Sequence, residues 1–241
     1  MDSRCNYYCY RRSREPVNYE INKADLVEIV FFDMDGVLTD ILSSWRLIHE
    51  YFKTSNEGSV DEYLRGTITD LEFIERDVSL WQENGRFTKR DIIQNILTTV
   101  SLMNGAQQCV SFLRDNNVKT AIISAGLDLL AEKVADELGI DYVFANGVKI
   151  DNEGRLTGEG ILKVQLMYKD KTVRRLAKNL HTPFEHCAAV GNSCFDIPMF
   201  ETCGMGIAFN PQDQCVREAA DIVIEGKDLS KLIPALQPFI H

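Results

Sequence analysis

The sequence lacks several features that would place it in large classes of proteins. No stretch of its 241 residues approaches the roughly 18 consecutive apolar residues needed to span a membrane as a helix. The first residues are polar and rich in arginine, and no apolar run follows them, so we expect no secretory signal. Positive charge is also scarce, since 26 basic residues face 36 acidic ones and leave a formal net charge of -10. This balance disfavours nucleic acids and anionic membranes as general partners.

A disulfide framework is also absent. The seven cysteines are an odd number, and most of them lie in apolar or motif contexts, which is typical of reduced thiols in a cytoplasmic protein. Cys5 and Cys9 have the spacing of half a zinc site, but no second pair of ligands with suitable spacing follows them. Because residues 1–24 also lack hydrophobic periodicity, we interpret them as an N-terminal arm.

What the sequence does contain is an alternation of strand and helix patterns. Residues 28–32 end in a continuous apolar run, which is typical of a strand buried on both faces of a parallel sheet. Similar runs follow at 120–124, 188–192, 206–209 and 221–225, with amphipathic helical patterns between them. The sequence therefore predicts an α/β fold with a doubly wound, mainly parallel sheet, whose site lies at the carboxyl ends of the strands.

Two segments interrupt this alternation. Residues 41–100 contain no buried-strand run but several apolar stripes at helical spacing, one of them opened by a capping box at Thr69. We predict a small all-helical cap there, inserted after the first strand of a core that consists of residues 25–40 and 101–241. The second interruption, 148–161, has a polar turn between two short β-prone runs and predicts a hairpin.

Two acidic residues follow the first predicted strand. Asp33 and Asp35 are two residues apart, so their side chains start on the same side of the strand, and Gly36 lets the backbone turn away. Two close carboxylates repel each other unless a cation or a proton lies between them. Taken alone, the pair fits a turn that ends a strand as well as it fits a site.

Further polar segments follow at later strand and helix ends. The run 124–126, Ser-Ala-Gly, offers a hydroxyl and backbone N–H groups that can hold an anion. A serine hydrolase is not indicated, because no Gly-x-Ser-x-Gly elbow is present. Lys169 and Lys171 stand at the start of a predicted helix, where a lysine is unfavourable unless an anion is near. The segment 191–196 adds another carboxylate and an amide oxygen.

In this order, these segments resemble the motifs of the haloacid dehalogenase (HAD) superfamily of phosphatases, and within it the phosphoserine phosphatase-like branch. The resemblance spans about residues 28 to 232, and its most specific part is the run Asp-Met-Asp-Gly at 33–36. It implies a magnesium-dependent phosphatase that hydrolyses a small phosphate monoester. In that reading Asp33 is the covalent nucleophile, and Asp35 is the general acid and then the general base.

The resemblance also implies the remaining site residues. Ser124, Ala125, Gly126 and a lysine would neutralise the phosphoryl oxygens. The family spacing favours Lys169 as that lysine, with Lys171 as the other candidate. The implied ligands of Mg²⁺, with Asp35 acting through its main-chain carbonyl, are Asp33, Asp35, Asn192 and Asp196.

Several positions depart from the family pattern. Asn192 stands where an aspartate usually binds the metal, which removes one negative charge from the site. Where phosphoserine phosphatases use a Glu and an Arg to hold the substrate's amino and carboxylate groups, this chain has Leu42 and Asp77. Phosphoserine is therefore a weak candidate substrate. Three arginines are candidates for a replacement contact, each otherwise an ordinary solvated residue: Arg46, Arg76 and Arg86.

Three functions remain open on the sequence alone. The leading hypothesis is hydrolysis of a small phosphate monoester. A phosphomutase would share the covalent chemistry but return the phosphoryl group to a bound intermediate, and a non-catalytic metabolite-binding protein would keep the fold with a weakened metal site. The expected partners are Mg²⁺ and a small phosphorylated metabolite, and the expected location is the cytoplasm. A homodimer is left open.

Overall fold

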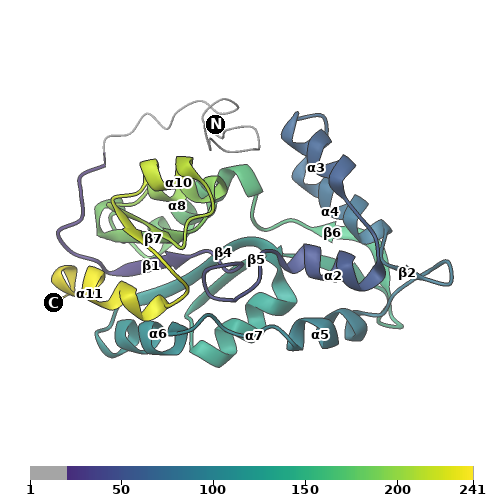
Figure 1. Cartoon of the computed structure of the whole chain (residues 1–241), viewed down its shortest axis with the longest axis horizontal. Coiled ribbons are helices and arrows are strands. Elements are labelled where there is room, and N and C mark those ends of the chain that lie inside the picture. Colours follow the sequence, from purple (N-terminus) through teal and green to yellow (C-terminus); the bar gives the residue numbers. More distant parts are fainter. Residues whose placement is uncertain (1–20, 241) are drawn as a thin grey trace.

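A seven-stranded sheet forms the centre of the computed structural model, which describes residues 21–240 (Figure 1). Most of the predicted arm, with Cys5 and Cys9, lies outside these residues. The strand order is β6-β5-β4-β1-β7-β8-β9, and each neighbouring pair is parallel except β5 and β6. The predicted doubly wound, mainly parallel α/β fold is confirmed.

The strands form where the sequence has continuous apolar runs. The five central and edge strands predicted from these runs are β1 (Ile29–Phe32), β4 (Lys119–Leu127), β7 (Cys187–Gly191), β8 (Met205–Phe209) and β9 (Ile222–Ile224). The predicted hairpin is the antiparallel pair β5 (Tyr142–Ile150) and β6 (Leu156–Ile161). In β1 every residue is buried, because helices cover both faces of the sheet.

The helices are short. Their bounds are α2 (Ser44–Phe52), α3 (Glu57–Leu64), α4 (Asp70–Ser79), α5 (Arg90–Thr98), α6 (Ala106–Asp115), α7 (Asp128–Leu138), α8 (Lys169–Asn179), α9 (Ile197–Phe200), α10 (Gln214–Ala219) and α11 (Leu232–Leu236). The longest of those described, α7 and α8, have 11 residues each. No helix within residues 21–240 has both the length and the apolar character that crossing a bilayer requires.

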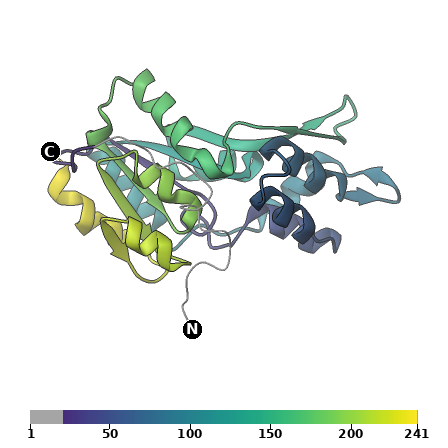
Figure 2. The same ribbon diagram turned by 90° about the horizontal axis from the view of Figure 1, so that it is seen from above.

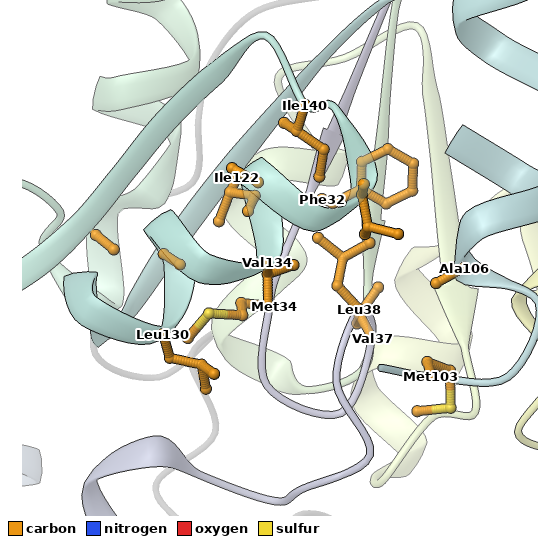
Figure 3. Packing of buried hydrophobic residues seen from close by; sticks show 14 of the residues in the cluster. Phe32, Met34, Val37, Leu38, Met103, Ala106, Ile122, Leu130, Val134 and Ile140 are labelled. Carbon is orange, nitrogen blue, oxygen red and sulfur yellow. The ribbon is translucent and has the colours of Figure 1, made fainter. Parts of the chain in front are cut away.

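The core lies in two layers, one on each face of the sheet. Alternate residues of β1 divide between them: Val30 and Phe32 join the cluster under α6 and α7, whereas Ile29 and Phe31 join the cluster under α8. Figure 3 shows Phe32 within the first cluster. Because β1 also pairs on both edges, with β4 and β7, the chain that leaves it starts from a rigid central position.

Residues 41–100 contain helices α2 to α5 and, in addition, a short hairpin of β2 (Gln82–Glu83) and β3 (Arg86–Phe87), which the helical pattern did not predict. Its turn residues Asn84 and Gly85 both have positive φ, the geometry for which Asn-Gly is preferred. Helices α2, α3 and α4 lie together at one end of the molecule, whereas α5 packs beside α7 (Figures 1 and 2). The predicted domain boundaries stay predictions.

Candidate active site

Asp33 follows directly after β1, and its carboxylate is buried at the carboxyl edge of the sheet. Nζ of Lys169, the first residue of α8, lies 2.9 Å from Oδ1 of Asp33 and 2.6 Å from Oδ1 of Asp196. Burial alone would lower the pKa of Lys169, but the two carboxylates raise it above its ordinary value, so the ammonium keeps its proton. Lys171 instead donates to the side chain of Gln165 at the surface. The structure therefore brings Lys169, and not Lys171, to Asp33.

Asp196 holds the loop that follows β7. Its Oδ2 accepts hydrogen bonds from the main-chain N–H groups of Asn192, at 2.9 Å, and Ser193, at 3.0 Å. Its Oδ1 faces Lys169, so protein groups engage both carboxylate oxygens. Burial raises the pKa of Asp33, and the negative charge of Asp196 adds to this rise while Lys169 opposes it. Asp196 is fully buried and is not among the residues that line the cavity, so it positions the lysine and the loop.

The two carboxylate oxygens of Asp35 have different surroundings. Oδ2 accepts hydrogen bonds from the main-chain N–H of Ser44, at 2.8 Å, and from its hydroxyl, at 2.9 Å. Oδ1 is buried and finds no hydrogen-bond partner among the residues that the structure describes. Burial raises the pKa of Asp35 from 3.8 to about 6, against the opposing hydrogen bonds from Ser44. A carboxyl group that keeps its proton this close to neutrality is suited to donate it to a leaving group.

Ser44 and Trp45 connect α2 to the site, and the sequence did not single out either for this role. The Ser44 hydroxyl oxygen also accepts a hydrogen bond from the N–H of Leu127, at 3.0 Å. Nε1 of Trp45 donates to the main-chain carbonyl of Ala125, at 2.9 Å. Trp45 belongs to one of the apolar stripes at helical spacing in 41–100, but the residue that it contacts lies 80 residues further along the chain. The contact itself therefore had no local signal.

The predicted anion-binding run lies within the last residues of β4. Oγ of Ser124 accepts a hydrogen bond from the N–H of Gly126, at 3.1 Å, which leaves the hydroxyl hydrogen free to be donated. A Cβ on Gly126 would lie 2.9 Å from Oδ2 of Asp35, so a side chain has no room there. Ser124, Ala125 and Gly126 all line the cavity that contains Asp33 and Asp35. The structure therefore brings these five residues together.

Asn192 packs against the turn that contains Gly36. Its Nδ2 donates to the carbonyl of Asp35 at 3.1 Å, and a Cβ on Gly36, where φ is +77°, would lie 2.1 Å from that nitrogen. Within residues 21–240, no three Asp, Glu, His or Cys side chains converge as metal ligands. The available oxygen donors are the Asp33 carboxylate, the Asp35 carbonyl and, after a 180° turn of its amide, Asn192. Mg²⁺ takes few protein oxygens and keeps several waters, so this set fits the ion.

The three candidate arginines lie in different places. Arg46 lines the cavity, but its guanidinium pairs with Glu50 at 2.8 Å on an exposed face of α2. Arg76 pairs with Glu62 at 2.8 Å and lies outside the cavity lining. Arg86 is exposed in the β2–β3 hairpin. The structure therefore brings none of these guanidinium groups to the carboxylates of the site.

A cavity of about 440 Å³ lies between the sheet edge and helices α2, α3 and α4. Polar groups form its core end: Asp33, Asp35, Ser124, Lys169 and Asn192. Apolar side chains and two further carboxylates form its cap end: Val60, Tyr63, Leu64, Phe73, Ile74, Asp70 and Asp77. The cavity is thus divided between a charged end that suits a phosphoryl group and a mixed end that suits the rest of a small molecule.

Comparison with known proteins identifies the family. The haloacid dehalogenase-like hydrolase family matches residues 27–204, so the chain belongs to this family. Phosphoserine phosphatases of Archaeoglobus fulgidus and Methanocaldococcus jannaschii are 29% and 28% identical to it over 87% and 86% of its length. The chain spans 60% of the first relative and 96% of the second.

A solved structure agrees with these relatives. A phosphoserine phosphatase determined as a phospho-aspartyl intermediate analogue has a TM-score of 0.74 and 25% identity, covering 87% of this chain and 99% of that one. The predicted superfamily, its phosphoserine phosphatase-like branch and the enzyme class of a HAD-type hydrolase are confirmed.

Proposed function

We propose that this protein is a Mg²⁺-dependent phosphatase that hydrolyses a small phosphate monoester through an aspartyl-phosphate on Asp33. The observation that carries the proposal is the pairing of Asp33 with Lys169 in one cavity with Asp35, whose pKa burial raises to about 6. The relative solved as a phospho-aspartyl intermediate analogue supports the same chemistry.

The first step forms one bond and breaks another. A carboxylate oxygen of Asp33 attacks the phosphorus atom while the bond from phosphorus to the ester oxygen breaks. Asp35, which lines the same cavity as Asp33, gives its proton to the departing oxygen. The Ser124 hydroxyl and the Lys169 ammonium stabilise the negative charge on the phosphoryl oxygens.

The second step restores the enzyme. Asp35, now a carboxylate, takes a proton from a water molecule as that water attacks phosphorus, and the bond from phosphorus to Asp33 breaks. Inorganic phosphate then leaves. When bound by Asp33, the Asp35 carbonyl and Asn192, Mg²⁺ supplies positive charge that offsets the charge of the phosphoryl group.

Replacing the nucleophile tests this proposal. In Asp33→Asn, Mg²⁺-dependent release of phosphate from p-nitrophenyl phosphate should fall by roughly 10³-fold or more, because an amide cannot form the acyl phosphate. Asp61→Asn is the matched control, since it makes the same charge change on the exposed side of α3, where Asp61 pairs with Arg65. Undiminished turnover in Asp33→Asn would exclude the proposed mechanism.

Binding without turnover is the second candidate, and Asn192 favours it, because it leaves the metal site one negative charge short. Two measurements, of thermal shift and of phosphate release, distinguish a phosphatase from a binding protein. Beryllium fluoride with Mg²⁺, a phosphoryl mimic, should raise the melting temperature of the wild type but not of Asp33→Asn, if the phosphoryl site is intact. A thermal shift without release of phosphate from any ester would indicate a binding protein.

A further inference from the structure

One face of α4 lines the cap end of the cavity. Asp70, Phe73, Ile74 and Asp77 all line it, and their spacing of three, four and seven residues places them on a single side of the helix. This face of α4 therefore has two carboxylates with apolar side chains between them. Seven residues of helix separate these carboxylates by roughly 10 Å along the axis.

Asp77 is 3% exposed, yet it forms no ion pair with a lysine or arginine in the described part of the chain. Nδ2 of Asn56 donates to both of its oxygens, at 3.0 and 2.9 Å. Nε2 of His49 lies 3.5 Å from Oδ2 of Asp77. Nδ1 of His49 lies 2.8 Å from Oγ1 of Thr54 and 3.3 Å from Nε1 of Trp81. Asp77 is thus hydrogen-bonded by a neutral amide, and no lysine or arginine of residues 21–240 pairs with it.

Asp70, at the other end of this face, is also held by neutral donors. Its Oδ1 accepts hydrogen bonds from the Tyr63 hydroxyl, at 2.9 Å, and from the N–H of Leu166, at 2.8 Å. Burial raises the pKa of Tyr63, and the adjacent Asp70 raises it further, so the phenol stays neutral. The cap end therefore presents two negative groups to whatever occupies it.

Positive groups that would receive a substrate carboxylate are turned away from this end. The guanidinium groups of Arg46 and Arg76 are paired with glutamates on exposed helix faces. A leaving group that carried a carboxylate would meet Asp70 and Asp77 in a largely buried space, where repulsion between like charges is strong. A leaving group that carried an ammonium would gain a charge-assisted hydrogen bond there.

We propose that the cavity selects phosphate monoesters of amino alcohols, in which the leaving group has an ammonium, a short hydrocarbon chain and no carboxylate. The proposal rests on the proposed function, which places the phosphoryl group at Asp33. The ammonium pairs with Asp77, and the rings of Tyr63 and Phe73 in the same lining favour a cation as well as a hydrocarbon. Asp70 and Asp77 line the same cavity as Asp33 and Asp35, which marks them as part of a substrate site.

Calorimetric binding to the Asp33→Asn protein with Mg²⁺ tests this selectivity without turnover. The probes are phosphoethanolamine, ethyl phosphate, which lacks the ammonium, and phosphoserine, which adds a carboxylate. We expect phosphoethanolamine to bind about tenfold more tightly than either of the others, as one charge-assisted contact allows. Equal binding of the three esters, tighter binding of phosphoserine, or no binding of phosphoethanolamine would overturn the proposal.

Substitutions at Asp77, Asp70 and Asp61 distinguish a specific role of the two cavity carboxylates from a general effect of negative charge. Asp77→Asn keeps an acceptor for Asn56 but removes the charge, so it should abolish the tenfold preference, whereas Asp61→Asn should keep it. Asp70→Asn is a second variant for use where Asp77→Asn does not fold. A preference that survives both substitutions would also overturn the proposal.

Hydrolysis of p-nitrophenyl phosphate by the wild type reports the proposed function separately, because this ester has no ammonium. Hydrolysis together with equal binding of the three probes would refute the amino-alcohol selectivity alone. Selective binding without any hydrolysis would refute the phosphatase assignment alone.

Discussion

At the scale of single residues, the chemistry of Asp35 follows from where its two oxygens lie. Ser44 engages one oxygen, and the other is buried without a partner in the described part of the chain. An unsolvated carboxylate oxygen is costly, so the protein holds the proton more tightly than an exposed aspartate does. The same burial that prepares Asp35 as an acid must therefore lower the stability of the fold once that proton is lost.

Asp35→Asn should make the metal-free protein more stable at neutral pH, by about 1–3 kcal/mol. The pKa of Asp35 is about 6 in the folded protein against 3.8 for the free side chain, so the folded state binds the proton more tightly. Wild-type stability should consequently fall as the pH rises from about 4 to about 6, and Asn, which does not ionise, should escape that loss. Urea denaturation with a chelator, across this window and beyond both its ends, measures the difference. A constant difference at all pH values would contradict the reasoning.

At the scale of elements, α2 is the helix of the predicted cap that contacts Asp35 and Ala125. Ser43 caps its N-terminus by accepting a hydrogen bond from the N–H of Arg46, which fixes the first turn. The first two residues of that turn are Ser44, which contacts Asp35, and Trp45, which contacts the carbonyl of Ala125. The position of this helix therefore sets the position of the proposed general acid.

Trp45→Phe should lower both stability and turnover. The phenyl ring keeps an aromatic contact with Trp81 but loses the N–H that donates to Ala125, at a cost of about 1 kcal/mol in the free energy of unfolding. We expect kcat/KM for p-nitrophenyl phosphate to fall several-fold, because α2 then holds Asp35 less firmly. Tyr51→Phe, on the exposed side of the same helix, is the control and should change stability by less than about 0.5 kcal/mol. Equal effects of the two substitutions would show that the hydrogen bond is unimportant.

The strands and the core of the site could be predicted because they follow from local rules. Burial on both faces leaves continuous apolar runs such as 188–190, and the carboxyl ends of parallel strands share one edge, so Asp33 and Ser124 had to meet. The contacts of Ser44 and Trp45 could not be predicted, because they depend on how the cap packs on the core. The β2–β3 hairpin was also missed, since strands of two residues are too short to show alternation.

At the scale of the whole molecule, the predicted cap and the sheet differ in the size of the buried hydrophobic clusters that stabilise them. Large clusters cover both faces of the sheet, whereas α3 belongs to a small separate cluster of Tyr63, Leu64 and Ile68. This small cluster packs against Leu166 and Phe195 of the core. Regions with few buried contacts open at a lower free energy than the core, so we expect α3 to open more readily than the sheet. A homodimer and a cytoplasmic location stay predictions.

Hydrogen exchange measured by mass spectrometry should show this difference. Amides of α3 should exchange faster than those of β1, and Mg²⁺ with beryllium fluoride should slow exchange in α3 by filling the cavity. Asp33→Asn is the control, because it should not bind the fluoride complex and should leave exchange in α3 unchanged. Exchange in α3 as slow as in β1 without ligand would show that the cap opens only when the whole domain unfolds.

The contact between Trp45 and Trp81, whose rings are tilted by 30°, has a practical consequence for such measurements. The chain has only 2 tryptophans, and their ring centroids lie 5.4 Å apart at the junction between α2 and the catalytic loop. Indole emission from this protein therefore originates at this pair of rings, with Trp45 beside the carbonyl of Ala125 and Trp81 beside His49. A change in the intensity or wavelength of tryptophan fluorescence during a ligand titration therefore reports on the contact between α2 and Ala125. No attached dye is needed.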